Sequence, residues 1–337
     1  MHKTGLVLDE RYQLHDTGPG HPERAERLVA ITRKLEQEGI AQRALRITPQ
    51  PADTDTIALI HDRRYIERVR ETCQRGDAYI DTPDSAICPK SYEIALLAVG
   101  GVVELAEAVA AGRCANGFAA VRPPGHHAEH NKSMGFCLFN NIAIAARHLQ
   151  RRHGYEKVLI LDWDVHHCNG TQHSFERDPS VFVCSLHQHP STCYPGTGWP
   201  HEVGEGRARG TKLNLPMAPG LGDEAYRKAF EESFLPAAKK FQPEFVLISA
   251  GFDAHTRDPL AGMNLTIEGF NYMQRAALDL AKDHCGGRVM SVLEGGYNLQ
   301  ALAECVADHV KIMMEYAAQS PKHEKLEPAT RPAEGAR

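Results

Sequence analysis

The chain has no run of about 18 consecutive apolar residues, so no segment of it is expected to span a membrane. Its first ten residues contain only a short apolar run, and we expect no secretory signal peptide. Basic residues are not in excess, since 38 Lys and Arg stand against 43 Asp and Glu, and there is no long basic run. We therefore expect no direct nucleic-acid binding.

Nine cysteines are present, but no two of them form a C-x-x-C pair. The odd number and the missing pair argue against a disulfide framework and against a zinc ribbon. Reduced thiols in a cytoplasmic protein are the simplest explanation, so we expect a cytoplasmic location. Histidine, in contrast, is abundant, with 19 residues, several of them clustered, and this indicates metal or proton chemistry.

Short apolar stretches alternate with helical stretches along the chain, which predicts an α/β fold with a parallel sheet between helices. Strands are expected at residues 5–8, 45–48, 117–121, 158–161, 181–186, 212–215 and 289–293, and in the stretch 245–255. Helices are expected at residues 22–39, 53–60, 63–73, 89–112, 140–153, 223–240, 266–284 and 299–316. Residues 77–88 and 188–210 are expected to be loops.

No linker or internal repeat interrupts the chain before residue 318. We therefore expect one domain over residues 1–318. Residues 319–337 are rich in Pro, Glu, Lys and Ala, which predicts a disordered C-terminal tail.

The most informative stretch, residues 158–171, has the sequence V-L-I-L-D-W-D-V-H-H-C-N-G-T. Its four apolar residues predict a buried strand of a parallel sheet. Asp162, Asp164 and His166 follow at alternate positions and so point the same way in an extended segment. Two carboxylates and an imidazole suit a borderline divalent cation, although this motif alone is equally compatible with a polar, hydrogen-bonded turn.

Three further stretches follow predicted strands. After residues 117–121, Pro-Pro-Gly forms a rigid turn that presents His126 and His127. The stretch 245–255 places Asp253 after a strand, and E-G-G-Y-N at 294–298 holds Tyr297. Taken singly, these features are typical of a solvated loop, a helix cap and a tight turn. Their occurrence at successive strand ends indicates a shared site, because parallel strands end at one edge of the sheet.

The combined residues provide what amide hydrolysis requires. Asp164, His166 and Asp253 would leave open positions on a Zn²⁺, which is the catalytic rather than the structural arrangement. The metal would activate water and polarise a carbonyl. His126 or His127 would transfer the proton, and the Tyr297 hydroxyl would donate to the forming oxyanion.

Five motifs carry a family resemblance: R-P-P-G-H-H-A, G-F-C-L-F-N-N, D-W-D-V-H-H-C-N-G-T, S-A-G-F-D-A-H and L-E-G-G-Y-N. In this order they resemble the histone deacetylase superfamily, which also contains acetylpolyamine amidohydrolases, and they are most similar to its class II branch. The resemblance covers roughly residues 4–316. It implies the arginase-deacetylase fold, a single α/β domain around a central parallel sheet of about eight strands.

The resemblance also implies residue roles. Asp164, His166 and Asp253 match the ligands of one zinc ion per chain, and Tyr297 matches the carbonyl-polarising tyrosine. His127 matches the proton-transfer histidine, and His126 its charged neighbour. Two residues match the partners behind these histidines, namely Asp162 behind His126 and Asn169 behind His127. Class I members have Asp at the latter place, and an amide there would leave His127 less basic.

Further positions match the substrate and alkali-metal sites of the family. Phe136 and Tyr194 match the aromatic walls of the acyl-lysine channel. Gly135, Asp84 and Leu260 match other substrate-binding positions of the family. Leu260 replaces the gatekeeper Glu of the polyamine-specific branch. One structural K⁺ would be held by Asp162, Asp164, His166, Ser185 and Leu186, and a second by Phe175, Asp178 and Val181. Cys168 replaces the usual Gly beside the zinc turn, and we expect a buried, inert thiol.

We therefore expect zinc-dependent hydrolysis of an acyl amide, namely deacetylation of Nε-acetyl-lysine in proteins or peptides. Three alternatives stay open: acetylpolyamines as substrates, other small acyl amides, and a non-catalytic acyl-lysine binder. A binuclear manganese ureohydrolase is rejected, because Cys168 and His255 stand where it needs carboxylates. The sequence does not decide between a monomer and a homo-oligomer.

Overall fold

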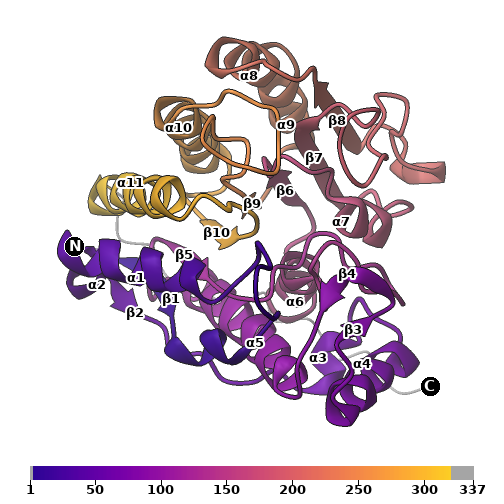
Figure 1. Cartoon of the computed structure of the whole chain (residues 1–337). Helices are drawn as coiled ribbons and strands as arrows, with labels where there is room; N and C mark the ends of the chain where they lie inside the picture. Colours follow the sequence, from indigo (N-terminus) through magenta and orange to yellow (C-terminus); the bar gives the residue numbers. More distant parts are fainter. Residues whose placement is uncertain (1–2, 320–337) are drawn as a thin grey trace, which may run out of the picture.

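The centre of the structure, a computed structural model that describes residues 3–319, is a sheet of eight strands (Figure 1). All neighbouring strands are parallel, in the order β2-β1-β5-β10-β9-β6-β7-β8. The predicted parallel sheet is confirmed. The strand in the predicted stretch 245–255 takes up only its first six residues, and each of the other seven strands lies within two residues of its predicted bounds. The strands are β1 (Thr4–Leu8), β2 (Leu45–Arg46), β5 (Asn116–Ala120), β6 (Val158–Asp162), β7 (Val181–Gln188), β8 (Lys212–Met217), β9 (Phe245–Ala250) and β10 (Val289–Leu293).

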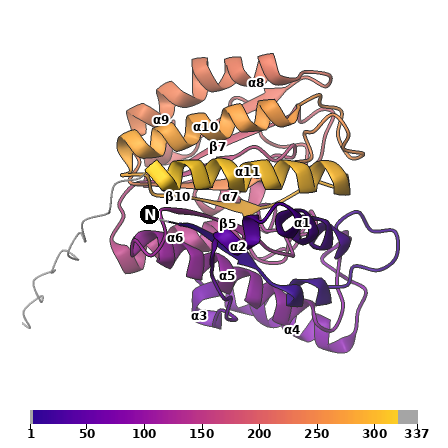
Figure 2. The ribbon, with the colours of Figure 1, turned by 90° about the vertical axis from the view of Figure 1, so that its left-hand side faces the viewer.

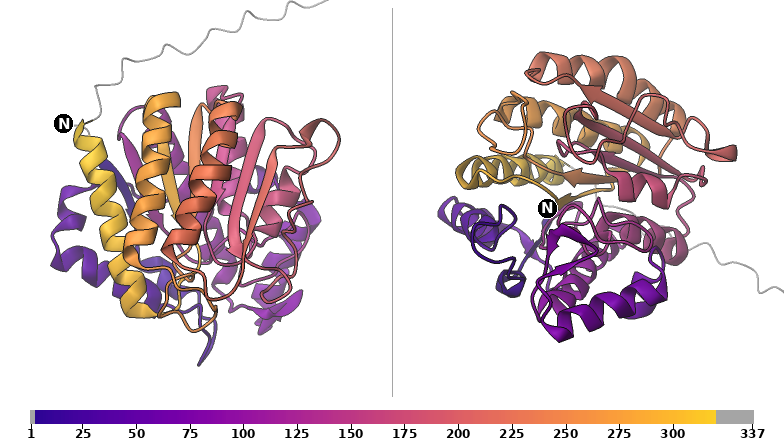
Figure 3. Two further views of the ribbon diagram at one scale, coloured as in Figure 1. Left: turned by 90° about the horizontal axis from the view of Figure 1, so that it is seen from above. Right: turned by 45° about the vertical axis from the view of Figure 1, so that its right-hand side comes forward.

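Helices cover both faces of the sheet (Figure 2). Helices α5 and α6 pack together on one face; on the other, α11, α10 and the α8–α9 pair lie side by side, with α1 against α11 (Figure 3). Central strands such as β6 and β9 are therefore buried along their whole length, which explains their continuous apolar sequences. The helices are α1 (Glu26–Gln37), α2 (Ile40–Arg43), α3 (Thr54–Ile57), α4 (Arg63–Arg75), α5 (Ser91–Ala110), α6 (Asn141–His153), α7 (Asn169–Ser174), α8 (Asp223–Ala229), α9 (Leu235–Phe241), α10 (Ile267–His284) and α11 (Leu299–Gln319).

The loop predicted for residues 77–88 is wrong in part. An antiparallel pair, β3 (Tyr79–Ile80) and β4 (Thr82–Ala86), forms there, with Asp81 in the left-handed region at φ 57° between the strands. Its Pro, Asp and Ser residues have low strand propensity, so pairing with the neighbouring segment overrides the local signal.

One predicted helix start is also wrong. The first helix begins at Glu26 and not at Pro22, because the Glu23 carboxylate turns inward to ion pairs with Arg27 and Arg122, at 3.0 and 2.5 Å. The helix predicted from residue 223 does begin there, as α8, and the Asp223 carboxylate accepts hydrogen bonds from the backbone N–H and hydroxyl of Thr266, at 2.9 and 2.6 Å. The helix predicted over 223–240 is interrupted by a π-helical turn, Phe230–Phe234.

Within residues 3–319, no helix combines the length and the apolar character needed to cross a bilayer. All nine cysteines are free thiols. The predicted tail, 319–337, lies outside the described residues except for Gln319, which ends α11.

Candidate active site

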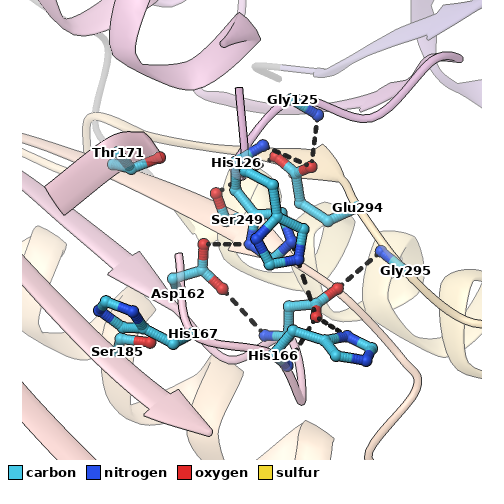
Figure 4. Close-up of polar contacts among 12 residues, drawn as sticks. Gly125, His126, Asp162, His166, His167, Thr171, Ser185, Ser249, Glu294 and Gly295 are labelled. Atoms are coloured by element: carbon cyan, nitrogen blue, oxygen red, sulfur yellow. Dashed lines mark hydrogen bonds and ion pairs between the residues drawn. The ribbon is translucent and has the colours of Figure 1, made fainter. Parts of the chain in front are cut away.

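The polar residues singled out in the sequence meet at the carboxyl edge of the sheet. The turn after β5 carries His126 and His127, β6 leads into Asp164 and His166, β9 leads into Asp253, and β10 leads into the 294–298 turn. Because β10, β9 and β6 are neighbours in the sheet, these strand ends lie side by side. Figure 4 shows His126 between Asp162, Glu294 and His166.

The three predicted metal ligands converge. His166 Nδ1 lies 3.0 Å from Asp164 Oδ1 and 3.2 Å from Asp253 Oδ2. The other carboxylate oxygens are held by backbone donors: Asp164 Oδ2 accepts from the Gly295 N–H at 2.7 Å, and Asp253 Oδ1 accepts from the Val165 N–H at 2.8 Å. Each carboxylate is therefore fixed on one side and presents its second oxygen to a common point.

The donor set fits a bound cation. Asp253 Oδ2 is buried and has no hydrogen bond of good geometry in the described part of the chain, although His166 Nδ1 is near. Burial and the neighbouring carboxylate of Asp164 raise the pKa of Asp253 to about 7, because two negative charges are close together away from water. Two carboxylate oxygens and one imidazole nitrogen, with open positions, suit Zn²⁺.

Gly295 permits the close approach of the two carboxylates to the backbone. A Cβ atom at this position would lie 2.1 Å from Asp253 Oδ2 and 2.5 Å from Asp164 Oδ2. Any side chain would therefore displace both groups.

His126 lies in a negatively charged environment. Its Nδ1 is 3.1 Å from Asp162 Oδ2, its Nε2 is 3.7 Å from Asp164 Oδ1, and its backbone N–H donates to Glu294 at 3.2 Å. Burial by itself lowers the pKa of His126, but the carboxylates of Asp164, Asp162 and Glu294 outweigh it and raise the pKa to about 10. His126 is therefore protonated near neutral pH.

His127 has a neutral partner. The Asn169 amide donates through Nδ2 to Glu129 Oε1 at 2.6 Å, which leaves its Oδ1 facing His127 Nδ1, also at 2.6 Å. Since an amide oxygen can only accept, the proton of His127 is on Nδ1 and its Nε2 is free. Burial and the neighbouring His126 and His166 hold the pKa of His127 well below its usual value.

The Tyr297 side chain lies close to the same centre. Its ring is edge-on to Phe136, with centroids 5.9 Å apart, and the Arg27 guanidinium lies 5.1 Å from its centroid. Its backbone N–H donates to Asp258 Oδ2 at 2.6 Å. Burial and the Asp253 carboxylate keep the pKa of Tyr297 well above its usual value, so its hydroxyl stays a proton donor.

Residues 21–313 match the histone deacetylase domain family. The chain belongs to this family. It is 41% identical over 299 residues to a probable deacetylase of Archaeoglobus fulgidus, across 88% of this chain and 82% of that protein. It is 40% identical over 305 residues to the human polyamine deacetylase HDAC10, across 87% of this chain and 44% of that protein. The solved HDA15 HD domain matches with a TM-score of 0.89 at 40% identity, over 94% of this chain and 90% of that one.

The aromatic residues matched to the channel of this histone deacetylase-like hydrolase flank the histidines. The Tyr194 ring is edge-on to His127, with centroids 5.1 Å apart. Gly135 and Phe136 have φ values of 57° and 68°, in a turn where the Cys137 N–H donates to the Met134 carbonyl at 3.0 Å. A positive φ is rare for a bulky residue such as Phe, and nothing in the sequence around Phe136 indicates it.

The backbone of Gly135 packs directly against the His127 ring. A Cβ atom at position 135 would lie 2.2 Å from His127 Cδ2, which leaves no room for a side chain. Its N–H donates to Asp84 Oδ2 at 3.2 Å. Burial and the same carboxylate raise the pKa of Tyr194. Asp84 is thus tied to the aromatic wall, whereas the side chain of Leu260 is 41% exposed.

The residues matched to the first alkali-metal site also lie together. Asp162 on β6 is paired in register with Ser185 on β7, and Leu186 follows. Cys168 is buried, and burial and the Asp162 charge raise the pKa of its thiol well above the usual value. A thiol of this kind is a poor nucleophile, as expected for an inert residue.

The backbone carbonyls of the residues matched to the second alkali-metal site all accept hydrogen bonds from within the protein. The ammonium group of Lys212 donates to the carbonyl oxygens of Val181 at 2.9 Å and Asp178 at 3.3 Å. The carbonyl oxygen of Phe175 accepts the Asp178 N–H at 3.0 Å.

Three acidic residues of the site were missed, although each is near or within a motif that was recognised. Glu294 accepts from the backbone N–H groups of Gly125 and His126, Asp258 accepts from Tyr297, and Glu129 accepts from Asn169. Their signal in the sequence is an acidic residue in a turn next to a proposed catalytic group. What such a residue contacts is decided by segments far away in the chain.

Proposed function

We propose that the protein is a zinc-dependent amidohydrolase that removes the acetyl group from Nε-acetyl-lysine in proteins or peptides. The observation that carries this proposal is the convergence of Asp164, His166 and Asp253 on one point, with an unpaired buried carboxylate oxygen. Family membership supports hydrolysis of an amide, and the surrounding side chains support the individual roles.

Asp164, His166 and Asp253 would hold one Zn²⁺. When bound, this ion would lower the pKa of a water molecule and polarise the substrate carbonyl. His127 has its Nε2 free, so it can accept the proton of the attacking water and later give it to the leaving amine. His126 stays protonated and acts as a fixed positive charge.

Tyr297 would donate a hydrogen bond to the carbonyl oxygen as negative charge develops on it. The rings of Phe136 and Tyr194 offer apolar faces for the methylene chain of an acyl-lysine. We also propose one structural K⁺ beside Asp162, Ser185 and Leu186, close to the carboxylate that orients His126.

Acetylpolyamines are the second candidate substrate class, supported by the 40% identity to the human polyamine deacetylase. Leu260 argues against it. Its side chain is apolar, so it cannot pair with a polyamine cation as a carboxylate would.

The test is turnover of acetyl-lysine peptides and acetylpolyamines by zinc-loaded protein. We expect faster turnover of the peptides. Faster polyamine turnover would favour the second candidate, and binding of peptides without turnover would make the protein an acyl-lysine binder.

The metal assignment has a separate test. Zinc analysis of Asp253→Ala should show lost zinc, whereas Asp283→Ala, which removes an exposed carboxylate on α10, should retain it. Full zinc occupancy in Asp253→Ala would contradict the ligand assignment.

A further inference from the structure

Lys212, the first residue of β8, is a buried residue that is 1% exposed. Its ammonium group lies among four oxygen atoms. Two are the backbone carbonyls of Val181 and Asp178, at 2.9 and 3.3 Å. The other two belong to Thr211, whose hydroxyl is at 2.8 Å and whose carbonyl is at 3.3 Å.

All four oxygens belong to uncharged groups. In the described chain, no carboxylate lies within ion-pair distance of the Lys212 ammonium. The carboxylate of Asp178 faces elsewhere, toward Arg147 at 2.5 Å and the Ser180 N–H at 2.9 Å. Burying an ammonium group is costly unless it is well solvated. These four dipoles supply the hydrogen bonds that water would otherwise make, and the carboxylates of Glu176 and Asp178 act on the ammonium only from a longer distance.

A cage of carbonyl and hydroxyl oxygens is the way in which proteins hold K⁺, because such dipoles substitute for the hydration shell of the ion. A lysine ammonium is a compact point charge of the same sign. Two of the carbonyls that it contacts, those of Asp178 and Val181, are two of the three expected to hold a second alkali-metal ion.

We infer that the Lys212 ammonium takes the place of the second alkali-metal ion in this chain. The positive charge beside the first residues of β7 and β8 then belongs to a lysine side chain and not to a bound ion. This part of the edge of the sheet should consequently keep its charge whatever salt is present, and only the site beside Asp162 and Ser185 should respond to K⁺. The inference does not depend on the proposed reaction.

Crystals of the wild-type protein grown with Tl⁺ in place of K⁺ provide the first test, since the anomalous signal of Tl⁺ locates alkali-metal sites. We expect no Tl⁺ within reach of the Val181 and Asp178 carbonyls. A Tl⁺ ion at these carbonyls, with the Lys212 side chain displaced, would overturn the inference.

The second test uses two variants and a control. Lys212→Ser removes the cation and leaves room for an ion, Lys212→Met removes the cation but fills the space, and Lys240→Ser changes an exposed lysine. Melting temperatures are compared in KCl and in choline chloride. Wild type, Lys212→Met and Lys240→Ser should share one K⁺-dependent shift from the first site. Lys212→Ser should gain an additional rise in Tm on the order of 3 °C, because an ion that binds only the folded state stabilises it.

An additional shift of the same size in Lys212→Met, or none in a folded Lys212→Ser, would contradict the inference. If Lys212→Ser does not fold in choline chloride, its recovery in KCl would support the inference, and failure to fold in both salts leaves the Tl⁺ experiment on the wild type to decide.

Discussion

His126 and His127 are neighbours in the chain, follow the same turn and are equally buried, yet their environments assign them different protonation states. His126 faces the carboxylates of Asp162 and Asp164, and its pKa is raised. His127 faces the Asn169 amide, and its pKa is lowered. The identity of a residue therefore does not decide whether it acts as a base or as a fixed charge; the charge of its hydrogen-bond partner does.

The largest effect that tests this difference is expected from His127→Ala. Removing the proton acceptor should lower kcat by roughly 10²–10⁴. His126→Ala should lower it less, since that residue supplies charge but does not move the proton. Steady-state kinetics of both variants, with zinc content measured in each, checks this. A larger loss in His126→Ala at equal zinc content would reverse the two roles.

Either the Tyr297 hydroxyl or the cationic His126 could polarise the substrate carbonyl, and a variant of Tyr297 distinguishes the two. If Tyr297 does so, Tyr297→Phe should lose roughly 10²–10³ in kcat and keep its zinc and its Tm. Tyr194→Phe, which also removes a hydroxyl beside the site, should stay within a few-fold of wild type. Activity of Tyr297→Phe close to that of wild type would transfer the role to His126.

Glu129 is expected to act on His127 through the orientation of Asn169. In Glu129→Ala the Asn169 amide can rotate and offer its NH₂ group to His127, which disfavours the Nδ1–H tautomer, so kcat should fall roughly tenfold. Glu129→Gln keeps an acceptor for Asn169 and should recover most of the activity. Equal losses in both variants would show that the charge of Glu129 matters and the orientation of Asn169 does not.

The smallest effect is a shift in pH dependence. Asn169→Asp places a carboxylate behind His127 and should raise its pKa. Because the neutral form of His127 is the base, kcat/KM increases with pH through that pKa, and the acidic limb of the profile should move to higher pH. An acidic limb that stays in place or moves to lower pH would mean that His127 is not the titrating base.

Much of the fold and the metal site follows from local rules. The apolar run of β6 and the alternation of Asp162, Asp164 and His166 predict a buried strand with polar groups at its end. Parallel strands end at one edge, so Asp253 and Tyr297 were expected near the same place. The family resemblance added roles for single residues, such as Asn169 behind His127, and the structure places these two side chains in contact.

The remaining features depend on segments distant in the chain. The oxygens around Lys212 come from residues 178, 181 and 211, and nothing in the sequence near residue 212 indicates that they surround its ammonium group. Likewise, Asp258 meets the Tyr297 backbone across 39 residues, and Glu129 meets Asn169 across 40. The strands and the chemical groups at their ends can be predicted from the sequence, because periodicity and strand direction are local or follow from simple topology. Which buried charge faces which dipole depends on the folded chain, because burial and the distance between partners set the electrostatic energy and both arise on packing.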